Sequence, residues 1–212
     1  MTETTPFEHK VTPRHTEFRM APDLTDVTIQ DIYGALVNDV TRNEMIAGDV
    51  ARSVESGRCP LLLTGRTEHL EYFAARLAGV AKYVFVLKGG MGKKQRRTVA
   101  AALASVPEGE SRIILATGSY IGQGFDDARL DTLFLAMPIS WKGTLQQYVG
   151  RLHRLHDSKR CHPCQPRRVN PEAYFAAWRS AAKVDGCLRA RPVFRRCCIA
   201  CRKFWRPKSS TS

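Results

Sequence analysis

Ile113-Ile114-Leu115-Ala116-Thr117-Gly118 is the stretch that decides the fold of this 212-residue chain. Four apolar residues come first, and a small polar residue and a glycine follow at once. A short apolar run that stops at a turn signal is typical of a strand buried on both faces of a sheet. We therefore expect a strand over residues 113–116 with a polar loop at its carboxyl end.

The same pattern recurs on both sides of this stretch, with helical periodicity in between. Apolar residues at i, i+3, i+4 spacing predict helices within 24–57 and over 68–78, 95–104 and 144–154. Fully apolar strands that alternate with helices are typical of a parallel sheet covered on both faces. The fold expected is therefore α/β, with further strands at residues 61–64, 83–87 and 132–136.

Polar and glycine-rich segments follow each of these strands. In open α/β sheets, ligands bind at the carboxyl ends of the strands. The segments should therefore line one edge of the sheet and form a single functional surface, made of Thr64-Gly65-Arg66, Lys88-Gly89-Gly90, Thr117-Gly118 and Pro138-Ile139-Ser140.

Two arginines near the end of this region suit a triphosphate. Arg151 and Arg154 are three residues apart, so they project from one face of the expected helix. Each guanidinium is a planar fork of donors that matches phosphate oxygens, and such arginines neutralise charge during phosphoryl transfer. Gly150 costs a helix about 1 kcal/mol relative to alanine, which favours close approach by a ligand or another backbone at this point.

Taken in order, these motifs resemble the second RecA-like domain of a superfamily 2 helicase. Residues 61–70 are similar to helicase motif IV, and residues 88–97 to the glycine-and-glutamine block that follows the next strand. Residues 116–126 resemble motif V, and residues 147–154 resemble motif VI, with the pattern Q-x-x-G-R-x-x-R. The resemblance runs from about Val11 to Arg154 and is closest to DEAD/DEAH-related, restriction-type helicases.

The resemblance implies roles for individual residues. Arg151 and Arg154 would face the phosphates of ATP, with Arg154 as the arginine finger, and Gln147 would position the nucleotide or the attacking water. Gly124 and Asp126 would lie beside the nucleotide. The contacts implied with nucleic-acid phosphates, which position a strand without reading its sequence, are Thr64, Arg66, Gln95, Thr117 and Gly118.

Two elements of a helicase motor are missing from the sequence. A motor holds ATP between two RecA-like domains, and the first carries the phosphate loop G-x-x-x-x-G-K-[ST] and an acidic pair for Mg²⁺. Residues 89–94 lack the Ser or Thr and the spacing of that loop. The sequence therefore predicts a helicase fragment that uses ATP and Mg²⁺ only with a first RecA-like domain, in cis or in trans. The alternatives are a non-catalytic nucleic-acid-binding module and a non-functional remnant.

Composition divides the chain near residue 158. Residues 158–212 carry 14 of the 33 Lys and Arg residues but only two acidic residues, a net charge of +12. They also hold six of the seven cysteines. We therefore expect an N-terminal extension over 1–23, a RecA-like domain over 24–157 and an irregular basic tail over 158–212.

Three interpretations of the tail stay open. Paired C-x-x-C motifs can supply four thiolates to Zn²⁺, here Cys161, Cys164, Cys198 and Cys201. A disordered basic arm could instead bind phosphates by counterion release, with Phe204 and Trp205 stacking on bases. A tail translated out of frame would leave the sheet without its last strand and with an exposed edge.

The remaining composition excludes several classes of protein. Hydrophobic residues make up 43% of the chain, enough for a folded core. No apolar run approaches the ~20 residues of a membrane span, and the polar, acidic start does not look like a secretory signal. A cytoplasmic protein that binds the backbone of DNA or RNA, and no membrane, is expected; the sequence does not choose between the two nucleic acids.

Overall fold

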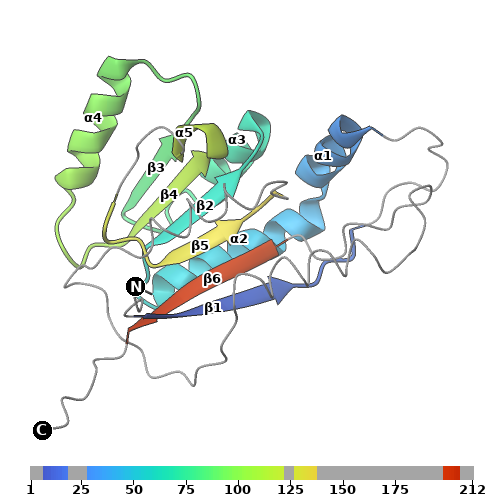
Figure 1. Cartoon of the computed structure of the whole chain (residues 1–212), viewed down its shortest axis with the longest axis horizontal. Coiled ribbons are helices and arrows are strands. Elements are labelled where there is room, and N and C mark those ends of the chain that lie inside the picture. The colour runs from blue at the N-terminus through green and yellow to red at the C-terminus, as the bar shows by residue number, and fades with distance from the viewer. Residues whose placement is uncertain (1–6, 19–27, 122–126, 138–197, 206–212) are drawn as a thin grey trace, which may run out of the picture.

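A six-stranded sheet forms the centre of the chain in the computed structural model, which describes residues 7–18, 28–121, 127–137 and 198–205 (Figure 1). Its strand order is β1-β6-β5-β2-β4-β3. The four strands β5, β2, β4 and β3 run parallel, whereas β6 pairs antiparallel with both β5 and β1. The strands are β1 Phe7–Arg14, β2 Pro60–Thr64, β3 Tyr83–Leu87, β4 Arg112–Thr117, β5 Thr132–Leu135 and β6 Cys198–Trp205.

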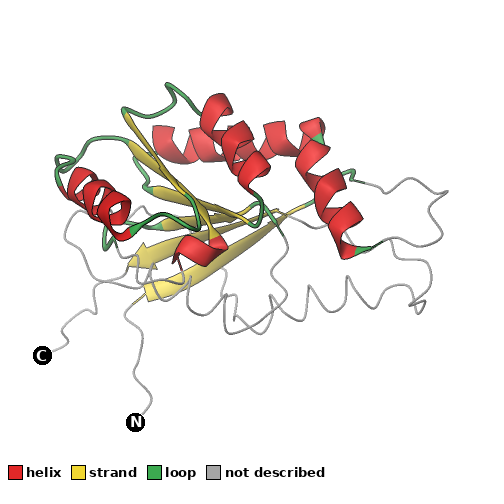
Figure 2. Ribbon diagram, turned by 90° about the horizontal axis from the view of Figure 1, so that it is seen from above, coloured by secondary structure: helices red, strands yellow, loops and turns green. Residues whose placement is uncertain are grey.

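Helices cover both faces of the parallel strands (Figure 2). Successive side chains of β2 pack on opposite faces of the sheet. Leu62 packs with α2 and α3, while Leu61 and Leu63 pack with α4 and α5. A smaller cluster joins α1 to Phe18 and Met137. The helices are α1 Ile29–Asn38, α2 Val40–Glu55, α3 Thr67–Arg76, α4 Lys93–Ala104 and α5 Gly118–Ile121.

Local capping explains why the region 24–57 forms two helices. Thr28 and Asp31 form a capping box at the start of α1. Asp39 ends α1 in an extended conformation and its side chain accepts a hydrogen bond from the backbone N–H of Arg42, 3.0 Å away, which begins α2. The expected helical region is therefore divided at Asp39, which caps the end of α1 and the start of α2.

The expected α/β fold is confirmed, with four parallel strands between two layers of helices. The strand expected at residues 83–87 has those bounds, and the other three parallel strands differ from expectation by one or two residues. The expected helix over residues 144–154 lies outside the described residues. Within the part of the chain that the structure describes, no helix is long and apolar enough to cross a membrane.

β1 and β6 were not expected. From the sequence, residues 7–14 were assigned to an extension and residues 198–205 to an irregular tail, yet the two segments pair over their whole lengths, from Phe7 opposite Trp205 to Arg14 opposite Cys198. β6 also pairs with β5, so the exposed edge expected if the tail were out of frame is not found beside β5. The edge is closed because a segment distant in sequence supplies its hydrogen-bond partners.

Candidate nucleic-acid interface

The carboxyl ends of β2 and β4 lie side by side. Thr64 is the register partner of Thr117, so two of the predicted contact residues end adjacent strands at the same edge. Both side chains are buried, with 3% of Thr64 and 7% of Thr117 exposed. The edge therefore brings the loops after β2 and β4 together as expected, but these two hydroxyls lie under its surface. The predicted segment Pro138-Ile139-Ser140 lies outside the described residues.

The loop after β3 approaches the end of β4 closely. The backbone N–H of Gly89 donates to Thr117 Oγ1 at 2.7 Å, and Thr117 Oγ1 lies 3.2 Å from Ser119 Oγ. A Cβ at position 89 would overlap the Ser119 hydroxyl, so only glycine fits without a shift. Because Thr117 is engaged within the protein, Gly118 and the exposed Ser119 are the groups that this edge presents to a ligand.

Thr64 belongs to a buried hydrogen-bond chain that crosses three elements. Its Oγ1 lies 2.9 Å from Nδ1 of His69 on α3, and Nε2 of His69 lies 2.8 Å from Oδ1 of Asn43 on α2. The Asn43 amide donates to the carbonyl of Val37 at 2.7 Å, which turns Oδ1 toward the ring. His69 therefore carries its proton on Nε2, and the Thr64 hydroxyl donates to Nδ1.

The ring of His69 is held neutral by its surroundings. Its side chain is fully buried, and burial, with a smaller contribution from the nearby Arg42 charge, lowers the pKa of His69 to about 3. A neutral imidazole with a partner on each nitrogen is a structural link between helices. This series of hydrogen bonds ends in the loop after β2, where the N–H of Arg66 donates to Thr64 Oγ1 at 3.4 Å.

Arg66 joins the edge to α1. It is the N-cap residue of α3, and its guanidinium donates to Oε1 of Gln30 and lies 5.6 Å from the ring centroid of Tyr33. A cation this close to an aromatic face is attracted to it. Arg66 is half-buried and oriented by these contacts, so its charge faces the same side of the molecule as the start of α1.

The first turns of α4 are the most basic described part of the edge. Gln95 is exposed, as are Lys93, Lys94 and Arg97. Arg96 is instead anchored, with Nε donating to the carbonyl of Met91 at 2.8 Å and its guanidinium 5.8 Å from the Tyr120 ring centroid. The first turn of α4 has no acidic residue to offset these charges.

The predicted nucleotide contacts lie outside the described residues. This holds for Gln147, Arg151 and Arg154 and for Gly124 and Asp126, so ATP binding by this chain stays a prediction. The buried chain through His69 and the exposed Ser119 were not predicted from the sequence. The hydrogen-bond chain through His69 could have been predicted from Asn43 and His69, which are polar residues at positions where the helical pattern calls for apolar ones.

The zinc interpretation of the four tail cysteines stays a prediction. Cys161 and Cys164 lie outside the described residues, and Cys198 and Cys201 fall within the extended strand β6. Among the described residues, no group of three or more His, Cys, Asp or Glu could hold a metal ion.

Comparison with known sequences gives a partial relationship. No protein-family model matches the chain. The chain is 29% identical over 120 residues to the transcript termination protein OPG145 of Monkeypox virus, an alignment that covers 55% of this chain and 23% of that protein. It is 28% identical over 120 residues to the transcript termination protein A18 of Vaccinia virus (strain Ankara). The chain thus spans about a quarter of the length of these relatives.

Comparison with solved structures supports the fold. T4 UvsW aligns with a TM-score of 0.51 and 18% identity, over 73% of this chain and 35% of that one. The C-terminal part of the Fun30 ATPase domain aligns with a TM-score of 0.49 and 12% identity, over 58% of this chain and 39% of that one. The described residues therefore form an α/β RecA-like domain, similar in sequence to part of a viral transcript termination protein.

Proposed function

We propose that this chain supplies the second RecA-like half of an ATP-dependent nucleic-acid helicase or translocase. The observation that carries the proposal is the carboxyl edge of the sheet. There the N–H of Gly89 bonds to Thr117, and the half-buried Gly118 and the exposed Ser119 follow at the same edge as the basic start of α4. Backbone N–H groups, small hydroxyls and cations are the groups that hold a phosphate backbone without reading bases.

The phosphate contacts proposed on this edge come from the segments after three strands, β2, β3 and β4. Gly118 and Ser119 follow β4, Arg66 follows β2, and Gln95 stands in the first turn of α4. Lys94 and Arg97 are exposed on the same turns and would add charge to this path. Either DNA or RNA fits such contacts, since both share the phosphate backbone; the transcript termination proteins that resemble this chain favour a role linked to nucleic acid.

The nucleotide chemistry is proposed from the sequence motifs. Arg151 and Arg154 would contact the ATP phosphates, Gln147 would position the nucleotide or the water, and Gly124 and Asp126 would lie beside the nucleotide. A separate first RecA-like domain would bring the phosphate loop and the acidic residues for Mg²⁺. The restriction-type helicases remain the proposed branch of the superfamily, and the cytoplasm the proposed location.

A two-part experiment tests this function. The purified chain is first titrated into a fluorescent single-stranded oligonucleotide, and its ATPase activity is then measured with and without an added first RecA-like domain. We expect binding by the chain alone and ATP hydrolysis only in the mixture, abolished in Arg154→Gln. Hydrolysis that is unchanged in Arg154→Gln would refute the arginine-finger assignment.

A non-catalytic binding module is the second candidate. The observation that favours it is the missing phosphate loop together with the strongly basic tail, part of which forms β6 within the sheet. This candidate predicts the same oligonucleotide binding but no ATPase activity in any mixture. The ATPase measurement therefore separates the two candidates.

A further inference from the structure

Little apolar packing holds α4 on the sheet. Leu103 is its single buried residue, and Val99 is partly buried against the same core. The exposed residues include Ala100, Ala101, Ala102 and Ala104. Burial of one leucine contributes about 1.5–3 kcal/mol, which gives little control over the direction of a helix that is about 18 Å long. Polar contacts at its two ends must therefore contribute much of its orientation.

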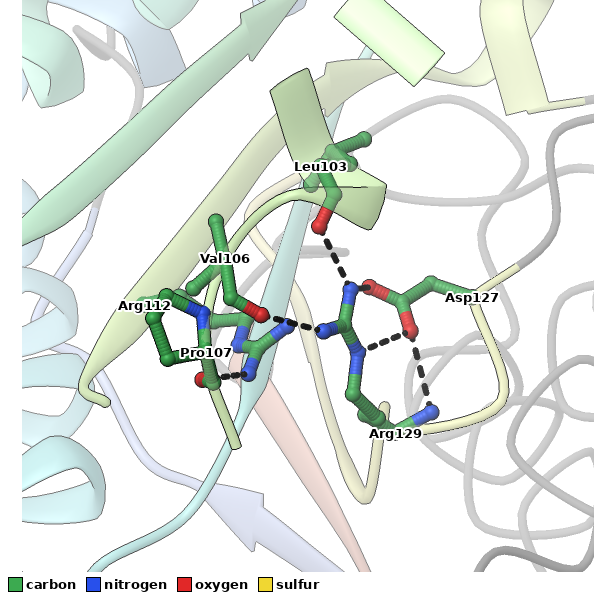
Figure 3. Close-up of polar contacts among 6 residues, drawn as sticks. All are labelled: Leu103, Val106, Pro107, Arg112, Asp127 and Arg129. Atoms are coloured by element: carbon green, nitrogen blue, oxygen red, sulfur yellow. Dashed lines mark hydrogen bonds and ion pairs between the residues drawn. The ribbon is translucent and has the colours of Figure 1, made fainter. Parts of the chain in front are cut away.

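Arg129 supplies the contacts at the carboxyl end of α4 (Figure 3). Its Nη2 donates to the carbonyl of Leu103 at 2.7 Å and its Nη1 to the carbonyl of Val106 at 3.1 Å. Asp127 holds the same guanidinium from the other side, with Nε to Oδ1 at 2.9 Å and Nη2 to Oδ2 at 3.2 Å. Four of the five guanidinium N–H groups are used, which fixes the fork in one orientation.

The charge distribution of α4 makes this anchor favourable. Its last turn has no basic residue, although carbonyl groups there carry partial negative charge. Arg129 provides the missing cation from a different part of the chain, and its side chain is only 13% exposed, so water screens the contact weakly. The same residue therefore satisfies helix carbonyls and complements the helix dipole.

The opposite end of α4 is joined to the loop after β4. Gly89, just before α4, is bonded to Thr117, and Arg96 within α4 lies against Tyr120 of α5. Arg129 lies at the far end of the β4–β5 connection. Both ends of α4 are thus held by residues from the two sides of that connection.

We propose that Arg129 is a positioning residue that sets where the exposed side chains of α4 stand relative to Gly118 and Ser119. The inference rests on the proposed binding of nucleic acid at this edge. Arg129 itself is turned toward Asp127 and the carbonyls of Leu103 and Val106, away from the proposed ligand. Its effect is exerted through α4, whose Gln95 and Lys94 meet phosphates only when the helix is held in register with the β4 loop.

A charge-conserving substitution tests this role. Arg129→Lys keeps the positive charge but removes the planar fork, so it cannot hold Asp127 and two carbonyls together. Binding of the full chain to a fluorescent single-stranded oligonucleotide is measured by anisotropy at several salt concentrations. The log–log salt slope falls by about 0.7 for each phosphate of the single strand that the protein no longer neutralises, while the contribution of the basic tail is the same in all variants.

A double-mutant cycle with Lys94→Gln gives a readout that a purely structural role would not change. In the wild-type background we expect Lys94→Gln to reduce the slope by about 0.7. In the Arg129→Lys background we expect it to have no effect, because Lys94 no longer reaches its phosphate. Arg76→Lys, which replaces an arginine ion-paired with Glu44 on α3, is the matched control and should leave the effect of Lys94→Gln intact.

The outcomes separate the inference from the function on which it rests. If Lys94→Gln has no effect in the wild-type chain, the proposed contacts on α4 are wrong. If it reduces the slope equally in both backgrounds, Arg129 only stabilises the fold and the inference is overturned. Urea denaturation establishes that each variant is folded. Should Arg129→Lys not fold, Asp127→Asn replaces it: it removes the carboxylate charge that orients the Arg129 fork, loosens the two carbonyl contacts with it, and is expected to reduce the same coupling.

Discussion

Acid should destabilise this protein through His69 before most carboxylates titrate. In the folded chain the pKa of His69 is lowered to about 3, whereas the unfolded ring titrates near 6.5. Between these values the unfolded state binds a proton that the folded state does not, so stability is fully present above pH 6.5 and falls as the pH falls. At pH 5 the loss is about 2 kcal/mol. This figure depends on the unfolded pKa alone, provided that the folded value stays well below 5.

Urea denaturation of the wild type and of His69→Gln at pH 7, 6 and 5 measures this effect. Glutamine does not titrate, so the difference between the two unfolding free energies should shrink by about 2 kcal/mol from pH 7 to pH 5. Hydrogen bonds to Arg76 and Tyr72 lower the pKa of Glu44, and those to Thr28 lower the pKa of Asp31, so both carboxylates titrate below this range. Gly65→Ala, which changes no titratable group, is the control and should retain the wild-type dependence.

A constant difference between the wild type and His69→Gln across this range would refute the reasoning. It would mean that the ring accepts a proton in the folded state, and hence that the hydrogen-bond chain from Asn43 to Thr64 is open to water. An NMR titration of the ring protons would identify the same failure directly, as a His69 midpoint near pH 6.5.

Three further predictions concern single positions. Gly89→Ala should lower the thermal denaturation temperature, because the added Cβ would overlap the Ser119 hydroxyl. Adding Ser119→Gly should recover most of this loss. Gly65→Ala, with no described atom within 4 Å of the added Cβ, is the control. Gly34→Ala should stabilise α1 by about 0.5–1 kcal/mol, measured in urea, since it removes a glycine from a helix interior without a described clash; a loss of stability would show that the site is filled. Burial raises the pKa of the Cys59 thiol to about 11, so its alkylation at pH 8, followed by mass spectrometry, should be about 100-fold slower in the native chain than in urea; equal rates would contradict its burial.

Local patterns were sufficient for the parallel part of the fold. The apolar run at β3 predicted both ends of the strand correctly, because five consecutive aromatic and aliphatic residues flanked by polar ones favour a short buried strand. The convergence of Thr64, Gly89 and Thr117 on one edge also followed, since parallel strands end on the same side. Hydrophobic periodicity and strand topology do not predict which hydroxyl faces outward. The Thr117 hydroxyl accepts a hydrogen bond from Gly89 and is buried, whereas Ser119 is exposed.

β6 could not be predicted because its stability comes from distant partners. Residues 198–205 are basic and rich in cysteine, and by composition they resemble an irregular arm. Pairing with β1 brings together residues about 190 positions apart, from Phe7 opposite Trp205 to Arg14 opposite Cys198. Strand pairing depends on such context more than helix formation does, so intrinsic preference is a weak guide for a segment of this kind.

α4 shows which part of an interaction the sequence indicates and which part only the structure gives. Four of its first five residues are cations, and its last turn has none. This distribution is opposite to the one that the helix dipole favours. The dipole preference is worth about 0.3–1 kcal/mol per charge, so an anion is expected at its start and a cation at its end. The structure supplies the cation as Arg129, which lies 25 residues beyond the end of the helix. The start keeps its exposed charges, and a phosphate backbone held there would complete the same electrostatic arrangement.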